Sequence, residues 1–484
     1  MTTRKGNKNN SSIEESSLPS SVTSSASGLS TTQVPNPNVN ANITSDISSP
    51  AAGLTTTEPN VSANITSDIS STSQSSSSDS IINPIYKPFV VMLPTDNHTE
   101  ILKMDPKVKL SYNIDYPNLS LGFHHYIHAA NDKYTEHIAL FKDKKQVYEI
   151  LNRFETSIDD YDKSISKVSN KHFGENIIDD EFYKLWEILY TFKLINKPNF
   201  ISVHFEGSGS FLRATELFRK MFHTGKADKH YVLSLDPSEH ELTKKHIDSL
   251  DKHITAQNYK SSLGKVDFIT ADGGINWQNM NRQEQDYYHI VLYYIMTAMS
   301  IQKHNGNFVC KFYETFTKSS AKLLYILTKL YNHVYMMKPI ISKNQDSERY
   351  AICTGFKYED KSPEYKSIYE SLSKMHDALH KNPDKHIVDI YEDFQLPKHF
   401  TKTLIYINKT IANKHQKQIS LINDFIDSQN YHGDAFQTNR DMQIESSEYW
   451  ISTYINKKPS DNFYKLTETI IEGNAQIIEH SIYF

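Results

Sequence analysis

The stretch from residue 181 to 358 alternates short apolar, β-rich runs with amphipathic helical segments, and this alternation constrains the fold more than any other feature. Helix-covered parallel sheets have near-continuous apolar strands, and strand–helix alternation is typical of a doubly wound α/β fold. Strands are predicted at 200–205, 230–235, 266–272 and 306–312, and helices at 180–195, 284–304 and 317–332.

The last two apolar runs, "HVYMMKPI" and "ERYAICTGF", have no helix between them. A parallel connection needs a crossover of a dozen or more residues, so this pair is predicted to be an antiparallel hairpin. The sheet is therefore mostly parallel with an antiparallel final strand. That strand begins at the edge where the parallel strands end, which places Glu348 at this edge.

The segments on both sides of this stretch differ from it in composition. Residues 1–82 are rich in Ser, Thr and Asn and carry the near-repeats "PNVNANITSDISS" and "PNVSANITSDISS", so we expect a disordered tail without chemistry. Residues 83–180 are expected to be an accessory region that begins with the strand-like "KPFVVMLP". Residues 359–484 are expected to be a helical accessory region that includes helices at 365–381 and 400–426.

The overall composition limits the classes of function. A formal net charge of −5 argues against electrostatic coating of nucleic acid but is compatible with a local basic groove. The two cysteines, Cys310 and Cys353, lie in apolar runs, which disfavours a disulfide framework or a zinc site. No run approaches the roughly 20 apolar residues of a membrane span, and the first residues lack the apolar core of a secretory signal. We therefore expect a soluble, cytoplasmic protein without a zinc site.

Ligands of doubly wound sheets bind at the carboxyl ends of the strands, where two segments here carry features of a binding site. In "HFEGSGSF", Gly207 and Gly209 would let backbone approach a ligand, although a bare strand–helix turn explains them equally well. The third glycine of the dinucleotide fingerprint is absent. Asp236, after the next strand, suits either a ribose contact or a helix N-cap.

Three further strand ends carry charged residues. Asp272 precedes two glycines and could be an ordinary turn aspartate. Lys311 closes an apolar strand, where an unpaired lysine is uncommon. With Lys184 from the preceding helix, Asp272, Lys311 and Glu348 would place two lysines and two carboxylates in one cleft. A neutral lysine there could take a proton from an alcohol, while the carboxylates hold and orient it.

Together these residues resemble the FtsJ-like ribose 2′-O-methyltransferases, in particular the branch that methylates the first transcribed nucleotide of capped mRNA. The resemblance lies in "VDFITADGG", "NGNFVCKFYETFT" and "VYMMKPIISKNQDSERYAICTGF", and more briefly in "FYKLWEIL". It implies a Rossmann-like domain over residues 181–358 that uses S-adenosylmethionine and no metal. It also implies the catalytic tetrad Lys184, Asp272, Lys311 and Glu348, in which Lys311 activates the ribose hydroxyl.

The resemblance places the methyl donor over a second set of residues, with two departures from the family. These residues are Glu206, Gly207, Ser208, Gly209, Phe211, Asp236, His253 and Asp272. The glycine motif, usually G-P-G-G, reads Gly-Ser-Gly-Ser here. His253 stands where members often carry an adenine-contacting aspartate, and Asp251 lies two residues earlier.

Two other functions are compatible with these residues. His253 and the altered glycine motif would suit a catalytically idle RNA-binding subunit, whereas the complete tetrad favours an enzyme. A ribosomal or transfer RNA methyltransferase would need the same tetrad, although the S-E-R-Y run favours the cap branch. The abundance of Asn, Lys, Ile and Tyr indicates an AT-rich genome and, with the resemblance, a large DNA virus that acts in the host cytoplasm or carries the protein in its virion.

Overall fold

The structure is a computed structural model. It describes residues 88–96, 101, 104–115, 117–141, 158, 164–177, 179–222, 227–233, 264–273, 279–359, 362–382, 384–430 and 432–481. The predicted disordered tail at residues 1–82 lies outside these ranges. No helix in the described ranges combines the length and the apolarity that crossing a membrane requires.

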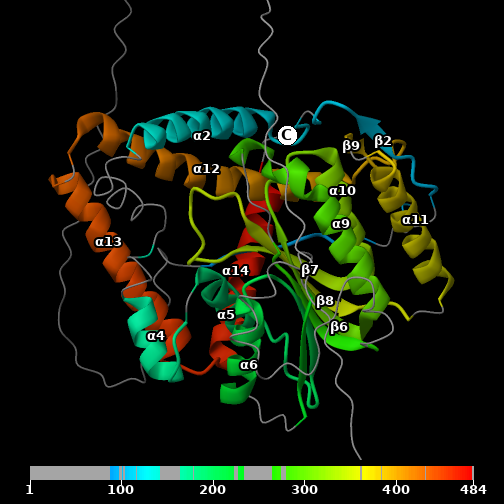
Figure 1. The fold of residues 1–484 in the computed structure, drawn as a ribbon, viewed down its shortest axis with the longest axis horizontal. Coiled ribbons are helices and arrows are strands. Elements are labelled where there is room, and N and C mark those ends of the chain that lie inside the picture. The colour runs from blue at the N-terminus through cyan, green and yellow to red at the C-terminus, as the bar shows by residue number, and fades with distance from the viewer. Residues whose placement is uncertain are drawn as a thin grey trace, which may run out of the picture. The chain divides into compact units, whose positions relative to one another are not determined.

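A mixed seven-stranded sheet forms the centre of the fold, with the strand order β1-β7-β8-β6-β5-β3-β4 (Figure 1). Strands β3, β4, β5 and β6 run parallel, whereas β8 lies antiparallel between β6 and β7. The bounds are β1 Phe89–Met92, β3 Ile201–Phe205, β4 Lys229–Leu233, β5 Val266–Ala271, β6 Gln302–Phe312, β7 Tyr331–Lys338 and β8 Arg349–Phe356. The predicted α/β class and the antiparallel hairpin β7–β8 are therefore confirmed.

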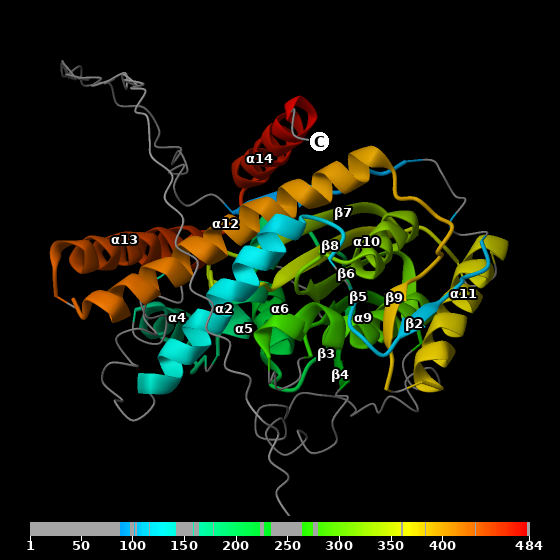
Figure 2. The same cartoon turned by 90° about the horizontal axis from the view of Figure 1, so that it is seen from above.

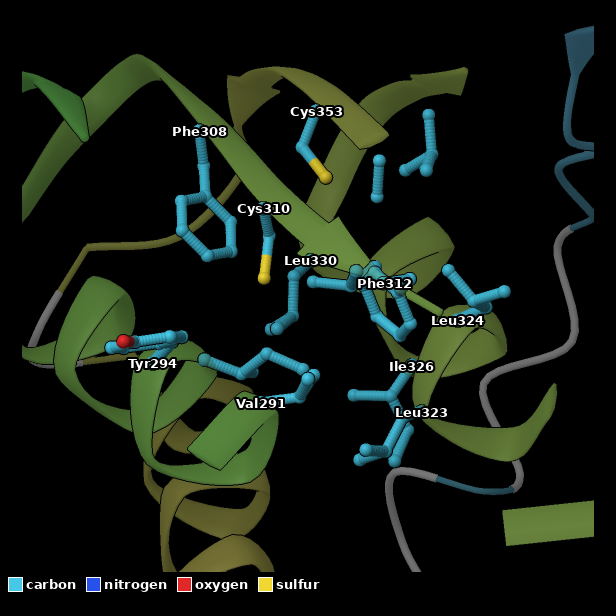
Figure 3. Packing of buried hydrophobic residues seen from close by; sticks show 14 of the residues in the cluster. Val291, Tyr294, Phe308, Cys310, Phe312, Leu323, Leu324, Ile326, Leu330 and Cys353 are labelled. Carbon is cyan, nitrogen blue, oxygen red and sulfur yellow. The ribbon is translucent and has the colours of Figure 1, made fainter. Parts of the chain in front are cut away.

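Each face of this sheet is covered by helices and has its own apolar core. Helices α9 (Gln283–Ile301) and α10 (Lys318–Leu330) bury one face, where Figure 3 shows Val291 and Tyr294 of α9 and Leu330 of α10 near Phe308 and Cys310 of β6. Helices α5 (Asp180–Thr191) and α6 (Ser210–Phe222) cover the other face. Successive residues of β6 alternate between the two cores, as a pleated strand requires.

The flanking regions add further elements around the sheet. They are β2 Lys109–Ser111, α2 Leu121–Phe141, α4 Ile165–Phe173, η4 Met280–Arg282, α11 Pro363–His380, β9 His386–Asp389, α12 Lys398–Ser428, α13 Asp434–Trp450, η5 Ile451–Ile455 and α14 Asp461–His480. β2 and β9 form a separate antiparallel pair. Helix α2 lies alongside α12 (Figures 1 and 2). The helices predicted at 365–381 and 400–426 are confirmed as α11 and α12.

Two strands differ from the prediction in position or extent. β1 pairs antiparallel with β7 at the sheet edge, a place that its sequence did not reveal. β6 begins at Gln302, directly after α9, instead of at 306, because the polar residues at its start still pair with β5. Both cysteines are free and buried, Cys310 on β6 and Cys353 on β8.

Candidate active site

Helix α5 places Lys184 in the interior, beside Glu348, the residue that directly precedes β8. The helix begins after Asp179, whose carboxylate accepts a hydrogen bond from the amide of Phe182. The Lys184 ammonium lies 3.0 Å from Asp180 Oδ2 and 3.0 Å from Glu348 Oε1, and it donates a hydrogen bond to Glu348 Oε2 at 3.2 Å. Because Lys184 and Glu348 are both buried, this is an interior ion pair.

A second buried ion pair lies at the ends of β5 and β6. The Lys311 ammonium is 2.8 Å from Asp272 Oδ1 and donates a hydrogen bond to the backbone oxygen of Asp272 at 2.9 Å. Tyr350, which faces Lys311 across the β6–β8 ladder, donates its hydroxyl to Asp272 Oδ1 at 3.2 Å. Since Tyr350 is two residues beyond Glu348, the ladder brings the two ion pairs to the same edge of the sheet.

The charges of these pairs are set by their neighbours as well as by burial. Burial alone would lower the pKa of Lys184, but Glu348 and Asp180 outweigh it and raise that pKa well above its usual value. Burial likewise lowers the pKa of Lys311, and Asp272, Tyr313 and Glu348 raise it beyond the ordinary range. Burial raises the pKa of Glu348, yet the surrounding lysines, Lys184 first, lower it overall. In the free protein both lysines are therefore ammonium ions.

The glycine-containing turn after β3 lies next to this edge. The amides of Asp272 and Gly273 both donate to the backbone oxygen of Phe205 at 3.0 Å, so the ends of β3 and β5 are fixed side by side. Glu206 follows Phe205 and accepts hydrogen bonds at the start of α6 from the amides of Phe211 (2.7 Å) and Leu212 (2.8 Å). Burial raises the pKa of Glu206 to about 8.

Of the other residues predicted in this turn, Gly209 has a left-handed φ of 80°, which favours glycine, and Ser208 is exposed. Gly207 is partly exposed, whereas the ring of Phe211 is buried in the core near Tyr350. Asp236, Asp251 and His253 lie outside the described residues.

Sequence reasoning missed three residues that contact this centre, of which Lys338 and Tyr350 are buried and Asp180 is partly exposed. Asp180 lies four residues before Lys184, a helical i,i+4 spacing that could have revealed the pair. The Lys338 ammonium donates to the backbone oxygens of Asp346 (2.7 Å) and Glu348 (3.0 Å), and burial lowers its pKa to about 8. Tyr350 is the third, and neither it nor Lys338 has a local sequence signal. Among the described residues, no three His, Cys, Asp or Glu side chains are grouped as a metal ion would require.

The sheet is mostly parallel, with helices on both faces, and only β8 and the edge strand β1 run in the opposite direction. With two buried ion pairs at its carboxyl edge, this is the architecture of a Rossmann-like domain. Residues 181–356 match the family model of FtsJ-like methyltransferases. This part of the chain is therefore an FtsJ-like methyltransferase domain.

The chain is also similar to proteins named as cap-specific mRNA (nucleoside-2′-O-)-methyltransferases. It is 26% identical over 249 residues to cap-specific mRNA (nucleoside-2′-O-)-methyltransferase 2 from Drosophila melanogaster. The aligned part covers 45% of this chain and 35% of the fly protein. It is 29% identical over 163 residues to cap-specific mRNA (nucleoside-2′-O-)-methyltransferase 1 from Homo sapiens. The aligned part covers 33% of this chain and 19% of the human protein. The similar part is thus about a third or less of each relative.

Similarity to solved structures is distant. A structure of human methyltransferase-like protein 13 in complex with SAH matches at 13% identity and a TM-score of 0.26, which covers 41% of this chain and 93% of that one.

Proposed function

We propose that this chain transfers a methyl group from S-adenosylmethionine to the ribose 2′-hydroxyl of RNA, and that its substrate is the first transcribed nucleotide of capped mRNA. The observation that carries the proposal is the meeting of Lys184, Asp272, Lys311 and Glu348 from α5, β5, β6 and the start of β8. Their order along the chain, Lys-Asp-Lys-Glu, is that of the tetrad expected from the sequence.

Glu348 and Lys184 are assigned to orient the ribose. The Oε1 atom of Glu348 is buried and accepts no hydrogen bond from the described residues, although Lys184 approaches it to 3.0 Å. A buried acceptor without a donor costs about 1–3 kcal/mol, so an incoming hydroxyl donor would be stabilised there. The ion pair with Lys184 holds the Glu348 carboxylate in place, while its Oε1 atom can still accept a hydrogen bond from a ligand.

Lys311 is assigned as the residue that takes the hydroxyl proton. The ribose oxygen forms the new bond to the methyl carbon, the carbon–sulfur bond breaks with its electron pair staying on sulfur, and the hydroxyl proton passes to Lys311 Nζ. This requires a neutral lysine, whereas neighbouring carboxylates keep Lys311 protonated in the free protein. A positive charge brought into the cleft would disfavour the ammonium and release its proton before transfer.

The residues beside Asp272 fit a cationic methyl donor. S-adenosylmethionine supplies an electrophilic methyl group on a positively charged sulfonium. Glu206 and Asp272 are buried carboxyl groups at adjacent strand ends, and Asp272 contributes to the raised pKa of Glu206. A cation bound beside them would favour their ionised forms. The left-handed turn at Gly209 lets the backbone between Glu206 and α6 approach a ligand without a side chain in between.

The choice of capped mRNA is supported by the names of the relatives, which are cap-specific mRNA methyltransferases. Two alternatives predict different results. An idle RNA-binding subunit would bind RNA without methylating it. A ribosomal or transfer RNA methyltransferase would methylate its substrate without needing a cap.

The test is incubation of the full chain with labelled S-adenosylmethionine and matched capped and uncapped RNA, followed by identification of the methylated nucleoside. We expect 2′-O-methylation of the first nucleotide of capped RNA and a loss of at least about 100-fold in Lys311→Ala, the scale of a lost general base. Lys303→Ala is the matched control, because Lys303 lies on the same strand but is partly exposed and pairs with Asp267 at 2.7 Å.

The outcomes separate the three functions. Equal methylation of capped and uncapped RNA would contradict the cap assignment and leave the chemistry standing. Full activity of Lys311→Ala would contradict the catalytic role of that lysine. RNA binding without any methyl transfer would favour the idle subunit.

A further inference from the structure

We propose that Asn408 is a positioning residue for the reaction centre, although it belongs to a helix outside the FtsJ-like segment. It lies on α12 and joins the loop that follows Lys311 to the strand that follows Glu348. The inference rests on the function proposed above for that centre, and it makes the C-terminal helical region a part of the catalytic unit.

The Asn408 side chain is fully buried and uses both of its polar atoms. Its Oδ1 accepts hydrogen bonds from Thr315 Oγ1 at 2.7 Å and from an Arg349 guanidinium nitrogen at 2.9 Å. Its Nδ2 donates to the backbone oxygen of Thr315 at 2.9 Å. A guanidinium only donates and a carbonyl only accepts, so this set of partners fixes which amide atom faces which partner.

The two partners of Asn408 are adjacent in sequence to catalytic candidates. Thr315 lies four residues after Lys311, and Arg349 directly follows Glu348. The backbone ladder between β6 and β8 ends at the pair Phe312–Arg349. Beyond that pair the loop containing Thr315 has no ladder bonds to β8, and Asn408 bridges the two segments where the ladder stops. This bridge fixes the separation between the end of β6 and the start of β8.

Loss of the Asn408 bridge would leave polar groups of the buried Arg349 and of Thr315 without partners. Its guanidinium is buried, with only 2% of the residue exposed, and its Nε donates to the backbone oxygen of Ser347 at 3.1 Å. Without Asn408, one buried guanidinium donor and the Thr315 carbonyl would both lose a partner. Movement of the loop or of the strand start is the available relief, because buried polar groups are rarely left unpaired.

Helix α12 is itself held by contacts with α2. His415 lies two helical turns beyond Asn408 and is hydrogen-bonded to Asn131 of α2 at 2.7 Å. Further along, Asn423 is hydrogen-bonded to His137 of α2 at 3.0 Å. Figure 2 shows α2 and α12 crossing the same side of the sheet. Asn408 therefore projects from a helix that is anchored independently of the two catalytic segments.

The test compares Asn408→Ala with Asn423→Ala in the full chain. Both changes remove a buried amide from α12, but Asn423 contacts α2 and neither catalytic segment. We expect kcat for methyl transfer to fall about 10- to 100-fold in Asn408→Ala, since small misplacements of reacting groups cost on this scale, with the KM for S-adenosylmethionine within about twofold. Asn423→Ala should keep kcat within about twofold.

A double-mutant cycle with Thr315 isolates the bond itself. Thr315→Ser keeps the hydroxyl and should keep kcat, whereas Thr315→Val removes it and should lower kcat several-fold. If both residues act through one bridge, the effects of Thr315→Val and Asn408→Ala on kcat will not add in the double variant. Full additivity would overturn the inference.

Hydrogen exchange gives a readout that does not depend on activity. Amides of residues 313–317 and 347–350 should exchange faster in Asn408→Ala than in Asn423→Ala at matched folded fraction. Equal exchange and equal kcat in the two variants would overturn the inference and leave the proposed function standing. An inactive wild-type chain would overturn the proposed function. The hydrogen-exchange rates of Asn408→Ala and Asn423→Ala would then be sufficient to show whether the bridge exists.

Discussion

Lys184 and Glu348 are 164 positions apart in the chain, and their side chains meet at 3.0 Å in a buried ion pair. The pair joins α5, which precedes the parallel strands, to the start of β8, the reversed strand at their carboxyl edge. The proposed reaction centre therefore forms only when α5 and the start of β8 are packed together at this edge. Removing one partner of a buried pair leaves an uncompensated charge, so each residue depends on the other.

The first prediction concerns Glu348→Gln. Glu348 contributes to the raised pKa values of both Lys184 and Lys311. An ammonium that loses a nearby carboxylate is less stabilised, so both pKa values should fall and neutral Lys311 should form at lower pH. We expect kcat to fall at least about 10-fold at its optimum while its rise with pH moves to lower pH, measured from about pH 6 to pH 10.

Glu472→Gln, on the exposed face of α14, is the control for this change. It should leave both kcat and the pH profile unchanged. Full activity and an unchanged pH profile in Glu348→Gln would show that Glu348 is an ordinary carboxylate at the edge of a strand.

The second prediction concerns the close approach of Gly273 and Tyr294. A Cβ atom at Gly273 would clash with the Tyr294 hydroxyl oxygen but would lie 3.6 Å from the adjacent ring carbon. Tyr294 is fully buried, so Gly273→Ala must displace its ring or the backbone next to Asp272. We expect a loss of about 1–3 kcal/mol in the free energy of unfolding, measured by denaturant titration, together with reduced methyl transfer.

The same contact predicts a rescue. The Tyr294 hydroxyl interacts with Tyr287, whose own hydroxyl donates to the Gly273 backbone oxygen at 2.6 Å, so Tyr294→Phe should cost only about 1 kcal/mol. Because only the hydroxyl clashes, the double variant Gly273→Ala/Tyr294→Phe should regain most of the lost stability and activity. No recovery in the double variant would mean that another contact excludes a side chain at Gly273.

The position of Glu348 could be predicted from sequence because one local fact determined it. Fewer than a dozen residues separate β7 from β8, which excludes a parallel crossover and forces a hairpin. The ends of β5 and β6 could also be predicted, since Asp272 and Lys311 follow largely apolar runs. The directions of the strands then place these charged residues at the same edge of the sheet, and this inference needs no information on side-chain contacts.

The supports of the site could not be predicted in this way. Asn408 and Trp450 reach the methyltransferase domain from helices far along the chain, and their neighbours in sequence carry no sign of these contacts. Lys338 is similar, because its partners are backbone oxygens, which every residue has. Periodicity shows that a helix has a buried face, but it does not show which distant segment that face contacts.

The third prediction concerns Glu187, which lies one helical turn after Lys184 on α5. Its buried carboxylate accepts hydrogen bonds from the amides of Ile340 (2.8 Å) and Ile341 (3.4 Å) and from Trp450 Nε1 (2.9 Å). It thus ties α5 to the turn between β7 and β8 and to α13. Glu187→Ala leaves two buried donors and one partly buried donor unpaired, and it should lower the free energy of unfolding by about 2–4 kcal/mol, measured by denaturant titration.

Glu187→Gln provides the comparison, since the amide retains one acceptor oxygen but adds donors that face other donors. Its loss of stability should lie between those of the wild type and Glu187→Ala. A change below about 0.5 kcal/mol in Glu187→Ala would show that these hydrogen bonds do not hold the turn.

The fourth prediction concerns the pH dependence of stability at Glu314. Burial, with a contribution from Glu284, raises the pKa of Glu314 from 4.5 to about 7, and its Oε1 has no hydrogen-bond partner among the described residues. The folded state thus keeps a proton that the unfolded state releases between these pH values. The free energy of unfolding should therefore fall as pH rises from about 4.5 to about 7 and then level off, by up to about 3 kcal/mol from this residue.

Glu314→Gln mimics the protonated side chain and should remove this loss. We expect the variant to be more stable than the wild type by up to about 3 kcal/mol at pH 8 and by less than about 1 kcal/mol at pH 5, from denaturant titrations at both values. Glu472→Gln, exposed on α14, should change stability equally little at both. A gain in Glu314→Gln that is the same at pH 5 and pH 8 would show that packing, and not ionisation, is responsible, because only the ionisation penalty varies with pH.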